Sequence, residues 1–138
     1  MSLVSIRPYF VTRMKSLGYH EHNETQFNNI SENKFNKTFH LDIGDVANRG
    51  NGQRSLELSC PVTVRAFYKG SNSESARDKA LEGMDAIITD LLNPVNRLNV
   101  SGLANVTFQS GKRDPYSDSN DQDAMLTLSF TAFVIYGT

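Results

Sequence analysis

The chain has one cysteine in 138 residues, no long apolar run and no excess of either charge. A single cysteine, Cys60, cannot form a disulfide within the chain, so we expect a reducing compartment, the cytoplasm. No apolar run approaches the length of a transmembrane helix, and the opening MSLVSIRPYF lacks the apolar core of a signal peptide. With 14 basic and 15 acidic residues, the net charge of −1 argues against a protein that binds nucleic acid through its phosphates.

What the chain does contain fits one domain, spanning residues 1–138. A chain of this length buries roughly two-thirds of its unfolded surface, so it needs neither a disulfide nor a metal to fold. Hydrophobic residues make up 38%, and the polar excess is gathered in a few stretches. This distribution indicates long loops around an ordinary core.

Apolar periodicity predicts two helices and four strands. In the first helix, apolar residues recur at steps of three and four; Ser5 suits its start and Gly18 its end. Ser75 suits the start of the second helix. Alternating polarity marks the strands. The expected elements are helices over 5–17 and 75–92 and strands over 37–43, 56–68, 104–110 and 124–136.

Three polar stretches separate these elements: Tyr19–Lys37, which is rich in asparagine, Asp45–Ser55 and Gly111–Asp123. They are interpreted as surface connections, the last two as long hairpin loops. Pro61 cannot donate to a strand ladder, which indicates an edge position or a bulge. The order helix, two strands, helix, two strands predicts an α+β fold, with a mixed or antiparallel four-stranded sheet and both helices packed on one face.

Two groups of residues suggest metal binding. His20 and His22 can share one face of a strand, but their stretch is polar and no second histidine pair or further cysteine accompanies them. In the acidic loop with Asp114, Asp118, Asp121 and Asp123, the spacing Asp118-x-Asn120-x-Gln122 faintly resembles a calcium loop, without the glycine at its sixth position or the late glutamate. We interpret both as solvated loops, and so expect neither a metal nor a cofactor.

No pattern in the sequence predicts a catalytic site. Cys60 is interpreted as a small buried residue; the alternative, a nucleophile, needs a nearby base that the sequence does not locate. The segment Gly50–Gly52 is too short to cradle a phosphate, and no serine lies in a nucleophile elbow. No carboxylate pair lies in an apolar setting that would separate its pKa values. We therefore expect a protein that is not an enzyme.

Charged residues gather in the two hairpin loops. Two interpretations stay open for them: ordinary solvation, and contact with a neighbouring subunit. A third, for the acidic loop, is a surface that repels DNA by like charge. The candidate interface or channel residues are Arg49, Arg54, Lys112, Arg113, Asp114, Asp118, Asp121 and Asp123.

Four segments carry a family resemblance: the opening helix 6–17, the strand LELSCPVTVRAFY, the helix SARDKALEGMDAIITDLL, and the loop GKRDPYSDSNDQD running into AMLTLSFTAFVIYG. In the order of their elements and in general sequence character, they resemble the tail terminator proteins of long-tailed bacteriophages, the family of the lambda minor tail protein U. The resemblance covers nearly the whole chain but includes no invariant motif. The asparagine-rich stretch Tyr19–Lys37 departs from it.

The resemblance implies a structural virion protein of the tail or neck, assembled in the host cytoplasm. It implies a homo-oligomeric ring, typically of six subunits, that caps the tail tube protein, ends tail growth and docks to the head–tail connector. DNA would pass through the channel without specific binding, and no membrane is involved. The sequence leaves open a head-completion or connector protein, a small non-catalytic binding module and, as the weakest alternative, a metal-dependent hydrolase.

Overall fold

The computed structural model of the chain describes residues 3–21, 37–51, 55–69, 73–98, 100, 102–115 and 124–137. Within these residues the chain forms two α-helices, two short 3-10 helices (η) and six strands. In chain order they are η1 (Leu3–Ser5), α1 (Ile6–Ser16), β1 (His20–Glu21), β2 (Thr38–Ile43), β3 (Ala47–Asn51), β4 (Ser55–Tyr68), α3 (Ser73–Leu92), η2 (Pro94–Arg97), β5 (Leu103–Pro115) and β6 (Ala124–Gly137).

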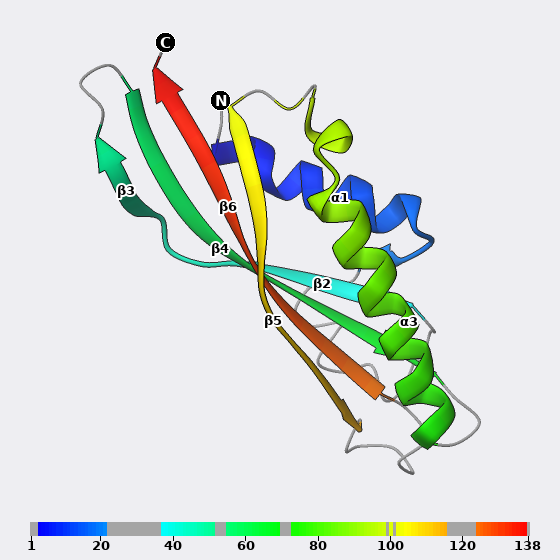
Figure 1. The fold of residues 1–138 in the computed structure, drawn as a ribbon. Helices are drawn as coiled ribbons and strands as arrows, with labels where there is room; N and C mark the ends of the chain where they lie inside the picture. Colours follow the sequence, from blue (N-terminus) through cyan, green and yellow to red (C-terminus); the bar gives the residue numbers. More distant parts are fainter. Residues whose placement is uncertain are drawn as a thin grey trace.

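The strands form one sheet in the order β1-β2-β4-β6-β5, and β3 also pairs with β4. β1 runs parallel to β2, while the other pairs are antiparallel. α1 and α3 lie on the same face of this sheet (Figure 1). The predicted α+β class, with a mixed sheet and both helices on one face, is confirmed.

The prediction of four strands is wrong, because β1 and β3 lie in stretches that were interpreted as loops. β1 consists of two exposed residues that pair with the start of β2. β3 has the sequence ANRGN and pairs with the first part of β4. Main-chain hydrogen bonds to a neighbouring strand define both elements, and such bonds leave no alternating side-chain pattern for the sequence to reveal.

Several predicted bounds also change. β5 continues to Pro115, so residues 111–115 of the expected loop Gly111–Asp123 belong to a strand. α3 begins at Ser73, which places Ser75 inside the helix. Ser5 makes no side-chain cap on α1, because its own backbone is already helical at the end of η1. A cap residue needs extended backbone for its side chain to reach the first turn.

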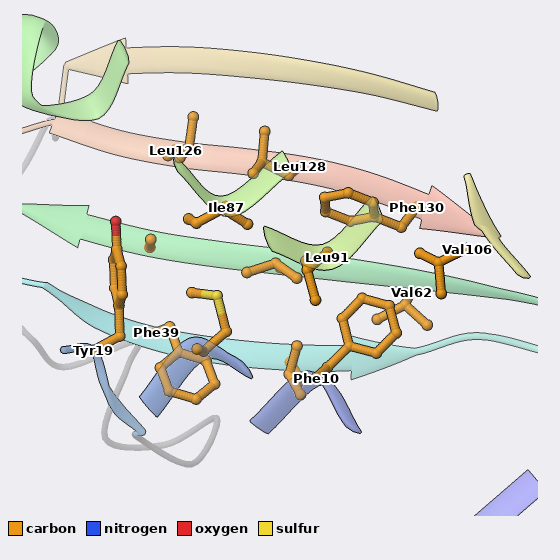
Figure 2. Close-up of a cluster of buried hydrophobic side chains, with 14 of the residues drawn as sticks. Phe10, Tyr19, Phe39, Val62, Ile87, Leu91, Val106, Leu126, Leu128 and Phe130 are labelled. Carbon is orange, nitrogen blue, oxygen red and sulfur yellow. The ribbon is translucent and has the colours of Figure 1, made fainter. Parts of the chain in front are cut away.

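The core lies between the two helices and the sheet (Figure 2). Phe10 of α1 packs against Phe130 of β6, with ring centroids 5.9 Å apart. Side chains alternate along β4 and β6, so every second residue points at the helices. The fully covered members include Phe39, Leu41, Cys60, Val62, Val64, Ala66, Ala80, Ile87, Leu91, Leu126, Leu128, Phe130, Ala132 and Val134.

Pro61 lies in β4, inside the sheet, so the predicted edge position is wrong, while the alternative, a bulge, fits the irregular pairing at this place. Along β4, residues 56–59 pair with β3 and residues 62–67 pair with β2, which leaves a break at Cys60 and Pro61. The Pro61 carbonyl accepts a hydrogen bond from the Gly44 N–H, at 2.8 Å, on the side of this break. In an antiparallel strand the nitrogen and carbonyl of one residue point to the same side. The missing N–H of Pro61 therefore faces the break and costs no ladder bond.

Candidate functional site

The two charged hairpin connections lie at opposite ends of the sheet (Figure 1). β4 and β6 pair along their full length, from Ser55 opposite Gly137 to Tyr68 opposite Ala124. The β3–β4 connection is therefore at one end and the β5–β6 connection at the other. A strand of 14 residues is roughly 40 Å long. The two hairpin connections are thus kept apart within one subunit.

At the β3–β4 end, Arg49 occupies an irregular position in β3. The register with β4 shifts between Asn48 and Gly50, which leaves Arg49 as the extra residue of a β-bulge. Arg54 lies outside the described residues. Two large apolar side chains in this half of the sheet are exposed to solvent, Val46 at 44% and Ile135 at 41%. This half of the sheet therefore exposes apolar surface.

At the β5–β6 end, Lys112, Arg113 and Asp114 follow one another near the end of β5. Lys112 and Arg113 are exposed and point to opposite faces of the strand. Arg113 points to the helix side, where its Nη1 donates to the Arg77 carbonyl of α3 at 3.2 Å. Asp118, Asp121 and Asp123 lie outside the described residues. The structure thus places Lys112, Arg113 and Asp114 in a strand and not in the loop that the sequence predicts.

The middle of the sheet face opposite the helices is polar, while Phe67 and Phe133 lie toward its two ends. The strand register aligns His40, Arg65, Thr127 and Lys112 in one row across four strands. The neighbouring row consists of Asp42, Thr63, Ser129 and Ser110. Alternation in the sequence identifies polar positions on each strand, but only the register aligns them into rows. This face combines hydroxyl groups with charges of both signs.

Sequence reasoning missed a polar cluster on the helix side, near the end of β4. Tyr19 and Tyr68 are 4% and 2% exposed, and their hydroxyls hydrogen-bond to each other. Lys37 Nζ lies 4.7 Å from the centroid of the Tyr19 ring. Burial raises the pKa of both tyrosines, so both stay protonated at neutral pH. One signal was available: Gly83 lies inside a helix, where an added Cβ would overlap the Tyr68 hydroxyl.

The residues considered for catalysis or metal binding do not form a cluster in the described part of the chain. Cys60 is buried, as predicted, and burial raises the pKa of its thiol, which disfavours the reactive thiolate. His20 is exposed in β1, and His22 lies outside the described residues. No group of three His, Cys, Asp or Glu side chains in the described ranges is arranged to hold a metal ion. No helix among them is long and apolar enough to cross a membrane.

Comparison with known proteins finds a likeness in fold alone. No protein-family model matches the chain, and no curated protein matches its sequence. The fold is similar to that of a chain in the virion of a native gene transfer agent (GTA) particle, with a TM-score of 0.54 and 17% identity over 72% of this chain and 69% of that chain. The core region of PilO from the type IV pilus system of Pseudomonas aeruginosa aligns over 81% of this chain and 91% of that chain, with 13% identity. Its TM-score of 0.31 is too low to show a shared fold.

Proposed function

We propose that the protein is a structural virion protein that forms a ring and caps the tail tube of a phage-like particle. The observation that carries this proposal is the full-length pairing of β4 and β6, which puts the β3–β4 and β5–β6 connections at opposite ends of one long sheet. In a ring of identical subunits, each subunit presents one patch to one neighbour and a different patch to the other. A basic end around Arg49 and a mixed end containing Asp114 meet that requirement.

The proposed contact joins the β3–β4 end of one subunit to the β5–β6 end of the next. Arg49 and Arg54 meet Asp114 and Asp118 across it. Opposite charges fix the register of such a contact and speed encounter, while apolar residues such as Ile135, 41% exposed, supply buried area. Lys112, Arg113, Asp121 and Asp123 complete the two patches or face the channel.

The likeness in fold to a chain of the gene transfer agent virion supports a role in a virion. In this proposal the ring ends tail growth by covering the tail tube protein, and its other side meets the head–tail connector. DNA passes through without specific binding, because aspartates on the channel wall repel its phosphates. The protein works as an assembled surface and not as an enzyme. It is built in the host cytoplasm and remains in the tail or neck of the virion.

Electron microscopy of the purified protein, alone and with tail tubes, tests this proposal. We expect rings, most simply of six subunits, seated at the tube ends. The double variant Arg49→Glu/Arg54→Glu should melt like the wild type and lose capping. Arg7→Glu, an exposed charge reversal on α1, is the matched control and should cap normally. Adding Asp114→Arg to the double variant should restore part of the capping, because it re-creates opposite charges across the contact.

Three results would overturn parts of this proposal. Normal capping by the double variant at both low and high salt would remove Arg49 and Arg54 from the interface. Rings that bind heads but never tail tubes would contradict tail termination and favour a connector protein. A chain that stays monomeric with and without tubes would contradict the ring itself.

A further inference from the structure

A cavity of about 260 Å³ opens beside α3, where α1 ends, β2 begins and β4 ends. One water molecule takes up about 30 Å³ of liquid, and pockets for drug-sized ligands measure about 300–1,000 Å³. The cavity therefore suits a group of a few non-hydrogen atoms. The lining residues that bear on its chemistry are Tyr19, Lys37, Tyr68, Lys79, Glu82 and Gly83.

The two tyrosine hydroxyls at this cavity carry two hydrogens, but the hydrogen bond between them takes up only one. Each phenol carries one O–H, and only one of the two hydrogens lies between the two oxygens. Among the described residues, neither hydroxyl has another hydrogen-bond partner. Both oxygens lie against Gly83, which is itself part of the cavity wall. Tyr19 and Tyr68 are almost fully buried and line the cavity, so a group bound there can accept the second hydrogen.

Two ammonium groups supply positive charge at the same place. Lys37 Nζ donates to the Leu17 carbonyl at 2.9 Å, and Lys79 Nζ donates to the Lys69 carbonyl at 2.8 Å. An ammonium group has three N–H donors, so each lysine has donors beyond the bond named here. Lys37 adopts a φ of 59°, in the left-handed region that few residues with a side chain enter. Its backbone N–H donates to the Phe67 carbonyl at 2.9 Å, which helps to hold that conformation.

We propose that this cavity binds a carboxylate on a short aliphatic stem. The tyrosine pair donates one hydrogen bond to a carboxylate oxygen, and Lys37 and Lys79 balance its charge. Leu17 and Ala86 line the same cavity and contact the stem. With Glu82 beside the two lysines, the wall carries a single net positive charge, which matches a carboxylate better than a doubly charged phosphate. The carboxylate belongs either to a free small acid or to an acidic side chain of a second copy of the chain.

The test is an NMR titration of the full chain with sodium butyrate, against sodium chloride and sodium phosphate at equal ionic strength. We expect saturable shifts of the Gly83 and Ala86 amide signals with butyrate alone. Tyr19→Phe/Tyr68→Phe should weaken binding roughly tenfold or more while the protein still folds, because both partners of the buried bond are replaced together. Lys79→Met should weaken binding about two- to fivefold, and Glu82→Gln should tighten it by a similar factor, since both groups are exposed.

A sedimentation measurement with and without butyrate separates the two sources of the carboxylate. Weaker self-association in butyrate assigns the site to an acidic side chain of a second copy, and unchanged self-association assigns it to a free acid. Shifts that do not saturate, that chloride reproduces, or that survive in the double tyrosine variant would overturn the proposal. The titration reads the cavity directly, so its result does not depend on whether the protein forms a ring.

Discussion

Arg13 of α1 and Asp90 of α3 are joined by two parallel hydrogen bonds, 2.6 Å from Nε to Oδ1 and 2.8 Å from Nη2 to Oδ2. Their side chains are only 25% and 14% exposed. Nearby, the Tyr9 hydroxyl donates to the Leu91 carbonyl at 2.8 Å, and the Asn96 amide donates to the Asp90 carbonyl at 2.8 Å. Together these bonds hold the end of α3 against α1 and η2.

The first prediction concerns this ion pair. Asp90→Asn should lower the free energy of unfolding by about 1–3 kcal/mol, because a partly buried guanidinium loses its charged partner. Urea unfolding measures the change. The control is the pair Lys15 and Glu21, which are 3.9 Å apart with side chains 58% and 35% exposed. Lys15→Met should change stability by less than about 1 kcal/mol. Equal effects of the two substitutions would contradict a special role for Arg13 and Asp90.

The second prediction concerns the buried face of α3. Ile87 is fully buried, so Ile87→Ala should cost about 2–5 kcal/mol through lost burial and the cavity left behind. Leu81 on the same helix is 50% exposed, and Leu81→Ala is the matched control. It should cost about half a kilocalorie or less. A similarly small loss for Ile87→Ala would mean that α3 packs through another face.

The third prediction concerns alkaline pH. Burial raises the pKa of Tyr9, Tyr19 and Tyr68 above the ordinary value of 10.0. Above pH 10 the unfolded chain therefore releases these protons while the folded chain keeps them. Their stabilising contribution is fully present below pH 10 and is lost as pH rises, by at most about 1.4 kcal/mol per pH unit for each tyrosine. Urea unfolding at a series of alkaline pH values measures the slope. Tyr19→Phe/Tyr68→Phe should flatten it, and an unchanged slope would contradict the assignment.

The fourth prediction concerns the histidines near the end of α1. His20→Ala/His22→Ala should leave melting and assembly unchanged, because we assign both side chains to solvent; the structure describes only His20, which is exposed. Elemental analysis of purified wild type and variant provides the second measurement. A stoichiometric metal in the wild type that disappears in the variant would contradict a protein that is not an enzyme.

The spacing of apolar residues in the sequence predicted most of the helices and strands, but not how they pair or pack. α1, β2, β4, α3 and β6 begin and end within two residues of the expected bounds, because their apolar side chains repeat with the period of the element. β3 was not predicted, because it has no apolar stripe and is held by its main-chain pairing with β4. Arg113 was expected among the interface residues, yet its guanidinium donates within its own subunit to the Arg77 carbonyl. A contact of that kind depends on where α3 lies relative to β5.

The sequence by itself determined the α+β class, the two helices and the side of β4 that is buried, because each is encoded in the spacing of neighbouring residues. Only the tertiary structure decided that the two charged hairpins lie at opposite ends of one sheet, and that Tyr19 and Tyr68, 49 residues apart, share a hydrogen bond beside Gly83. Strand register and the approach of distant segments place these groups. Both arise from packing over the whole chain, so no local spacing encodes them.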